Sequence, residues 1–173
     1  MLSGVASSSV SAETTCAAYR AGVTQSPDAM SRQLLRSALF CFFSALATGL
    51  SSYANNRRNK WIGWPGIASE ELSEADKEHI TQELFRHNCY PVFLSKRQLD
   101  DYYNGYSNSI LWPLFHDMPV NMEQHDRWWK AYRSVNKIFA EAVLHLSEPG
   151  STIWVHDYQL LVLPSLLRVE RPT

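Results

Sequence analysis

A long amphipathic segment at residues 122–146 leads into a short apolar one and limits the folds open to this chain. Its apolar side chains recur at helical spacing, and a Pro-Gly pair then stops the helix. Residues 151–157 predict a buried parallel strand. Residues 90–95 predict a short strand by their β-branched and aromatic content. Residues 158–170 turn helical again, with Pro164 inside the helix. Strand and helix alternate, so the sequence predicts an α/β fold.

Two capping boxes predict where further helices begin. Ser73 with Asp76 opens an amphipathic helix, and Ser95 with Gln98 opens the next one. The Asn-Gly pair at residues 104–105 is typical of a helix end, so we expect the second helix to stop there.

The first part of the chain has a different composition. Residues 1–25 are rich in Ser, Ala, Thr and Gly, so we expect a disordered lead. Residues 27–48 predict a helix whose apolar run is shorter than the roughly 18 to 20 residues needed to span a bilayer. A buried helix is the preferred interpretation over a membrane span, and a targeting peptide stays open as an alternative.

Charge and cysteine content exclude several classes of partner. The formal net charge is −1, without long runs of Lys and Arg, so we expect neither nucleic acid nor a membrane as a partner. The three cysteines lie far apart and form no zinc-binding pair, and their odd number favours a reducing, cytoplasmic location. Phosphate-loop, dinucleotide, metalloprotease and hydrolase signatures are absent, so the sequence predicts no cofactor and no metal.

The stretch "DDYYNGYSNSILWPLFH", residues 100–116, combines aromatic rings with amide side chains. Sugars offer C–H faces that lie on rings and hydroxyls that need polar partners, so this mixture indicates a possible sugar site. A turn at Gly105 would let the rings of Tyr103 and Trp112 approach one cavity. The loop "WIGWPG", residues 61–66, supplies a second aromatic group. Core packing is the alternative for each single ring.

Asp157 lies at the carboxyl end of the predicted strand, where ligands bind in open α/β sheets. Its carboxylate could accept hydrogen bonds from vicinal hydroxyls, or it could cap the helix that follows. The local pattern supports both interpretations equally. His116 and His125 each precede an aspartate, but neighbouring residues on a helix point in different directions, which argues against acid–base pairs.

Three motifs, "WIGWPG", "LDDYYNGYSNSILWPLFH" and "STIWVHDYQLLVLP", resemble in order and spacing the N-terminal half of the trehalose-6-phosphate synthases. The resemblance extends from about Ala45 to the C-terminus. It implies an incomplete, Rossmann-like N-terminal domain of a GT-B glycosyltransferase. Such enzymes transfer glucose from UDP-glucose to glucose 6-phosphate with retention of configuration. Residues 26–173 would form part of the acceptor-binding domain, and the donor domain would be absent.

The resemblance also implies roles for individual residues. Trp64, Tyr103 and Trp112 would line the glucose 6-phosphate site, and Asp157 would reach the sugars at the reacting centre as both a substrate-binding and a catalytic residue. Positioning and charge stabilisation would then account for most of the rate.

The sequence departs from the family at several points. Ser44 and Ala45 replace two glycines of the family's "GGLATGL", and Gln159 replaces a histidine. The family's first strand, "SNRLPV", is missing, as is the donor domain. We therefore expect the 173-residue chain to be inactive alone. The alternative is a non-catalytic relative that binds sugar phosphate or regulates a full-length synthase by associating with it.

Overall fold

The computed structural model describes residues 59–118 and 125–172. The predicted lead at residues 1–25, the predicted helix at residues 27–48 and the Ser44–Ala45 substitution lie outside the described residues. None of the helices in the described part is long and apolar enough to cross a membrane.

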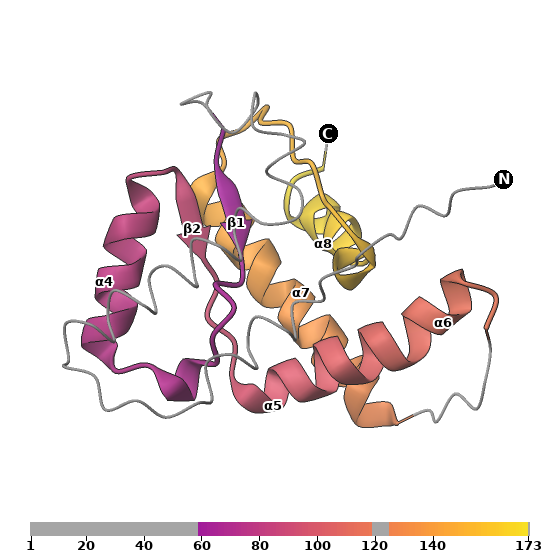
Figure 1. The fold of residues 1–173 in the computed structure, drawn as a ribbon. Coiled ribbons are helices and arrows are strands. Elements are labelled where there is room, and N and C mark those ends of the chain that lie inside the picture. Colours follow the sequence, from indigo (N-terminus) through magenta and orange to yellow (C-terminus); the bar gives the residue numbers. More distant parts are fainter. Residues whose placement is uncertain (1–58, 119–124, 173) are drawn as a thin grey trace, which may run out of the picture.

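The sheet of the described part consists of two parallel strands, β1 (Trp61–Gly63) and β2 (Cys89–Pro91), drawn side by side in Figure 1. Trp61 lies opposite Cys89, and an isolated parallel bridge between Ala68 and Leu94 extends the pairing. The expectation of a loop was wrong for residues 61–63, because the partner strand that supplies their hydrogen bonds is distant in sequence. The chain then bends at Gly66, which has a φ of 84°.

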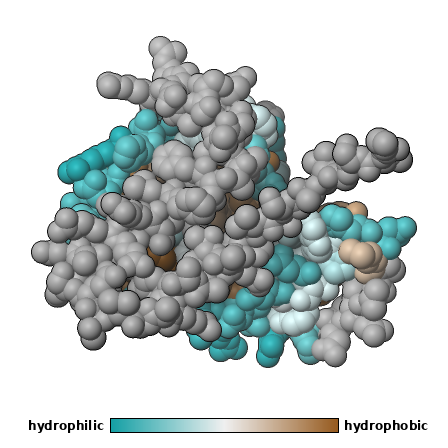
Figure 2. Space-filling view, in the orientation of Figure 1, coloured by the Kyte–Doolittle hydropathy of each residue, from teal (hydrophilic) through white to brown (hydrophobic). Residues whose placement is uncertain are grey.

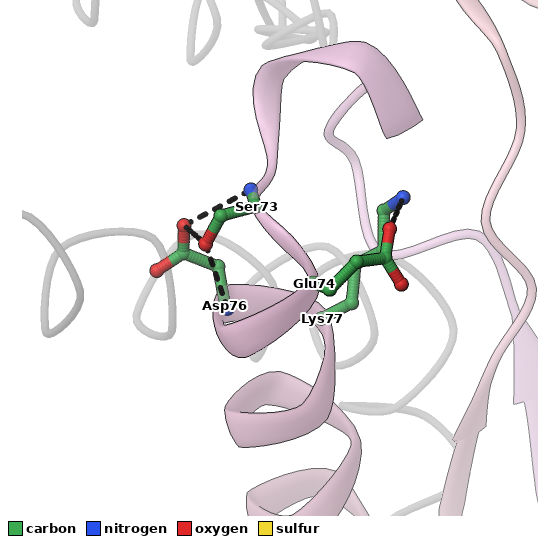
Figure 3. A network of polar contacts seen from close by, with 4 residues as sticks. All are labelled: Ser73, Glu74, Asp76 and Lys77. Atoms are coloured by element: carbon green, nitrogen blue, oxygen red, sulfur yellow. Dashed lines mark hydrogen bonds and ion pairs between the residues drawn. The ribbon is translucent and has the colours of Figure 1, made fainter.

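Between the two strands run η2 (Ser69–Glu71) and α4 (Glu74–Phe85). The predicted capping box is confirmed: the Ser73 hydroxyl accepts from the Asp76 amide at 3.1 Å, and the Asp76 carboxylate accepts from the Ser73 amide at 3.1 Å (Figure 3). Ile80 and Leu84 on the inner face of α4 pack in a small apolar cluster with Cys89 of β2. These contacts hold α4 against the sheet.

The second capping box, Ser95 with Gln98, is also confirmed and opens α5 (Lys96–Gln98). The helix does not end at the Asn-Gly pair, however. It continues as the π-helix η3 (Leu99–Leu111) and as α6 (Trp112–Phe115), which together form the long coil along the lower edge of Figure 1. Gly105 serves packing instead of termination, because a Cβ there would lie 2.8 Å from the ring of Trp128.

The long helix α7 (Asp126–Leu146) confirms the amphipathic pattern. It buries Tyr132, Val135, Asn136, Phe139, Ala140 and Val143. It packs against η3, α8 and β1, so it forms the centre of the main core. Arg171 donates to the carbonyl oxygens of Leu144 and Ser147 at 2.8 and 3.0 Å, which satisfies backbone groups at the end of α7.

The predicted strand at residues 151–157 does not form. These residues pair with no strand of the described part, and Ile153 and Trp154 are 39% and 65% exposed. A strand needs a neighbour to bond its backbone, and local sequence cannot supply one. The chain continues as η4 (Tyr158–Leu160) and α8 (Leu163–Glu170). Pro164 lies in the first turn of α8 and not inside it, because proline is tolerated where the amide needs no helical partner.

Candidate functional site

A cavity of about 1000 Å³ lies between β1, α7 and the segment at residues 151–160. Its apolar lining comes from several elements and includes Leu99, Phe139, Val143 and Leu163. Three residues singled out from the sequence line it together, namely Trp64, Tyr103 and Asp157. The fold therefore gathers two rings and one carboxylate around a single cavity.

Trp64 follows the carboxyl end of β1, and Tyr103 lies on η3. Their ring centroids are 6.3 Å apart, with an angle of 46° between the ring planes. The indole Nε1 of Trp64 donates to the carbonyl oxygen of Ile67 at 3.0 Å, which fixes the ring orientation. The two rings thus form a fixed aromatic wall that could contact the C–H face of a sugar.

Asp157 has an unusual backbone conformation, with φ 73° and ψ 161°. This region is populated almost only by glycine, and such strain concentrates at functional sites. Its Oδ1 accepts from the Tyr158 amide at 2.8 Å, so Asp157 caps η4 and also lines the cavity. The structure therefore confirms the capping interpretation, while hydrogen bonding of Asp157 to vicinal hydroxyls stays a prediction. With its amide nitrogen turned toward the carboxylate, Gln159 Nε2 lies 3.2 Å from both Asp157 oxygens.

The phenols beside Asp157 stay protonated at neutral pH. Burial raises the pKa of Tyr158 to about 12, with further contributions from Tyr103 and from the Asp157 carboxylate. Burial also raises the pKa of Tyr102, which lines the cavity next to Tyr103. These phenol groups are therefore neutral hydrogen-bonding groups and not bases.

Trp112 lies elsewhere. Its ring is 45% exposed, 3.8 Å from the imidazole of His116 and 5.6 Å from the ring of Tyr158, and it is not among the residues that line the cavity. The expected turn at Gly105 does not exist, so Tyr103 and Trp112 do not meet in one cavity as expected.

The amides of the same stretch bond within the protein. Asn104 donates to Asp100 at 3.3 Å, and Asn108 accepts from the Tyr158 hydroxyl at 2.8 Å. Neither amide side chain lines the cavity. Of the polar and aromatic mixture at residues 100–116, only the tyrosines at 102 and 103 reach it.

Tyr102 and Gln159 are among the lining residues that sequence reasoning missed. Tyr102 is adjacent to Tyr103, and adjacent residues on a helix usually face different ways. The sequence pattern therefore did not indicate that Tyr102 lines the same cavity as Tyr103. Gln159 was noticed only as a replacement for histidine. Its spacing two residues after Asp157 was the signal that could have indicated a contact.

The buried carboxylate of Asp101 has a structural role. Asp101 is 8% exposed and forms an ion pair with Arg127 at 3.1 Å, beside Arg97 at 3.9 Å, which accounts for its charge. Within residues 59–118 and 125–172 no cluster of His, Cys, Asp or Glu could hold a metal ion.

Comparisons with known proteins define the class. The sequence profile of glycosyltransferase family 20 matches residues 36–173. Trehalose-6-phosphate synthase of Mycolicibacterium smegmatis is 42% identical over 127 residues, 73% of this chain and 24% of that protein. The UDP-forming alpha,alpha-trehalose-phosphate synthase of Yarrowia lipolytica is 43% identical over 126 residues, 72% of this chain and 26% of its own length.

The fold comparison agrees. The UDP-forming synthase of Burkholderia xenovorans, solved in complex with glucose-6-phosphate, superposes with a TM-score of 0.56. It is 27% identical and matches 76% of this chain and 29% of its own. Parallel strands, the covering helices and this likeness define an incomplete Rossmann-like domain of the GT-B glycosyltransferase class. The chain belongs to glycosyltransferase family 20. It spans about a quarter of the length of the relatives it matches.

Proposed function

We propose that this chain supplies the acceptor side of a trehalose-6-phosphate synthase, which transfers glucose from UDP-glucose to glucose 6-phosphate with retention of configuration. The observation that supports this most is that Trp64, Tyr103 and Asp157 line one cavity. The names of the relatives support the reaction, and the complex of one relative with glucose-6-phosphate supports the acceptor. Residues 26–173 are, on this proposal, part of the acceptor-binding domain, and the protein is cytoplasmic.

The proposed contacts follow from sugar chemistry. A pyranose presents C–H groups to an aromatic wall, here Trp64 and Tyr103, while its hydroxyls donate to a carboxylate, here Asp157. Lys60 also lines the cavity, and its ammonium would favour a phosphate ester. Trp112 remains a predicted acceptor contact, to be made from outside the cavity of the described residues.

The proposed reaction exchanges one bond for another at the anomeric carbon of the donor glucose. The bond to the β-phosphate oxygen of UDP breaks, and a bond to the acceptor hydroxyl oxygen forms on the same face. The hydroxyl proton passes to the leaving phosphate, which departs as UDP. On this proposal Asp157 orients the sugars, and positioning supplies much of the rate.

Calorimetric titration of the 173-residue chain with glucose 6-phosphate and with glucose tests the acceptor site. We expect tighter binding of glucose 6-phosphate, and Asp157→Asn should weaken it about tenfold, or about 1.4 kcal/mol. Asp126→Asn, at the exposed start of α7, is the matched control and should leave the affinity unchanged. Equal affinity for both ligands would contradict the proposal and favour a general sugar-binding module.

A polypeptide of these 173 residues should not catalyse transfer alone, because a GT-B enzyme binds its donor mainly through a second domain. The measurement is UDP release from UDP-glucose and glucose 6-phosphate. Detectable UDP release by the pure chain would contradict this prediction, because it would show that transfer does not need donor contacts from a second domain.

A second candidate is a non-catalytic partner of a full-length synthase. It is favoured by the apolar end of α6, where Leu114 and Phe115 are 52% and 57% exposed, followed by Met118 at 50%. On the face shown in Figure 2, light brown atoms at the outer end of α6 stand out from hydrophilic surroundings. Co-elution with a purified full-length synthase, lost in Phe115→Ser, would support this candidate, and separate elution would exclude it.

A further inference from the structure

Two buried side chains of α7 bond to the main chain that follows Asp157. The Tyr132 hydroxyl donates to the Tyr158 carbonyl oxygen at 2.7 Å and accepts from the Leu161 amide at 3.1 Å. One helical turn further on, Asn136 Nδ2 donates to the Gln159 carbonyl oxygen at 3.0 Å. Three hydrogen bonds therefore tie the η4 turn to α7. We call Tyr132 and Asn136 the α7 clamp.

The turn needs such external support. η4 has three residues, too few for a helix to be stable on its own hydrogen bonds. The residue before it, Asp157, has the strained backbone described above, and strain of this kind persists only where the surroundings over-determine the conformation. The α7 clamp supplies that constraint from a rigid helix.

The α7 clamp does not contact the cavity. Tyr132 and Asn136 are 1% and 0% exposed, and neither lines the cavity. Burial raises the pKa of Tyr132 to about 12, so its hydroxyl stays protonated and can both donate and accept at neutral pH. Any effect of these residues on a ligand must therefore pass through the turn.

Asn136 also carries a cost that its packing does not explain. Its Nδ2 donates twice, to Gln159 and to the Tyr132 carbonyl oxygen at 2.9 Å, while its buried Oδ1 has no partner among the described residues. A buried polar atom without a partner destabilises a fold. An apolar side chain would avoid that cost, but it could not bond to the turn.

We propose that Tyr132 and Asn136 are positioning residues, which fix the η4 turn so that the Asp157 carboxylate is presented to a sugar hydroxyl in the cavity. The ligand part of this inference rests on the proposed function. The effect on the Asp157 backbone does not rest on the proposed function, so the backbone effect and the ligand effect can be tested separately.

The test uses the 173-residue chain with Tyr132→Phe and Asn136→Leu, which remove the hydrogen bonds and keep the bulk. Tyr106→Phe is the matched control, because the Tyr106 ring packs 4.6 Å from that of Tyr132 and does not line the cavity. NMR couplings and Cα shifts report the φ of Asp157, amide exchange reports Leu161, and calorimetry reports glucose 6-phosphate affinity.

We expect both clamp variants to fold with near-normal melting temperatures, to lose the positive φ of Asp157 and to bind glucose 6-phosphate about tenfold more weakly. Exchange of the Leu161 amide should quicken about tenfold in Tyr132→Phe, and Tyr106→Phe should resemble the parent chain. An unchanged Asp157 backbone in folded variants would overturn the inference.

A relaxed backbone with unchanged affinity would overturn its ligand part. If the parent chain binds no glucose 6-phosphate, the proposed function fails, and the Asp157 couplings still decide whether the α7 clamp positions that residue. If Asn136→Leu does not fold, Tyr132→Phe gives the same decision.

Discussion

The rings of Trp64 and Tyr103 lie with their centroids 6.3 Å apart, although they come from the end of β1 and from η3. The contact joins the small sheet to the long helical run and forms one wall of the cavity. A substitution in either ring should therefore change ligand affinity more than it changes the fold, because both rings are only half-buried.

Trp64→Leu should weaken glucose 6-phosphate binding about tenfold, or about 1.4 kcal/mol, because the flat face for the sugar is lost. Calorimetric titration measures this. Phe85→Leu removes a ring from the exposed end of α4 and should have no effect on affinity. Equal losses in the two variants would show that the effect is not specific to the cavity.

Asp157→Gly should stabilise the fold and weaken binding at the same time. Relief of the backbone strain, worth about 1 to 3 kcal/mol, exceeds the entropic cost of about 0.5 to 1 kcal/mol for a glycine. Asp157→Asn also removes the carboxylate but keeps the strain, so urea unfolding should find the glycine variant about 1 kcal/mol more stable than the asparagine variant. Equal stabilities would mean that Asp157 is not strained.

Gly105→Ala should destabilise the protein by about 1 kcal/mol in urea unfolding. The added methyl group would lie 2.8 Å from the ring atoms of Trp128. Overpacking of this kind costs about 1 to 3 kcal/mol, against a helix-propensity gain of about 1 kcal/mol. In a Trp128→Leu background, Gly105→Ala should instead stabilise the protein, because the ring that the methyl group would meet is gone. If Gly105→Ala destabilises equally in both backgrounds, the close contact is not the cause.

Folding stability should fall as the pH rises above 9, because burial raises the pKa of the Cys89 thiol from 9.0 to about 11. As the pH rises, the Cys89 thiol loses its proton in the unfolded chain before it does so in the folded one. The stabilisation that is fully present below pH 9.0 is therefore lost progressively as the pH approaches 11. Urea unfolding measured from pH 8 upward should show this slope in the parent chain. Cys89→Ala should reduce the slope, most clearly near pH 9, because the buried tyrosines, whose unfolded pKa is 10.0, contribute increasingly toward pH 10. An unchanged slope would exclude Cys89 as its source.

The site was partly predictable because its residues belong to recognisable motifs. Trp64, Tyr103 and Asp157 were all identified from sequence, and the structure places them around one cavity. Trp112 was identified in the same way but lies outside it. Residue type and motif indicated which side chains suit a sugar. Whether those side chains line the same cavity depended on the path of the helix through Gly105.

Local sequence determined the elements whose signals are local. The helical period of α7 and the capping boxes of α4 and α5 depend on residues three or four positions apart, so the sequence alone predicted them. Tertiary contacts decided the rest. Trp128 fills the space left by Gly105, β1 forms because β2 bonds to it, and residues 151–156 have no such neighbour in the described part. Asp157 acquires its conformation where the α7 clamp holds the next turn, since hydrogen bonds between distant residues can impose a backbone that local preference disfavours.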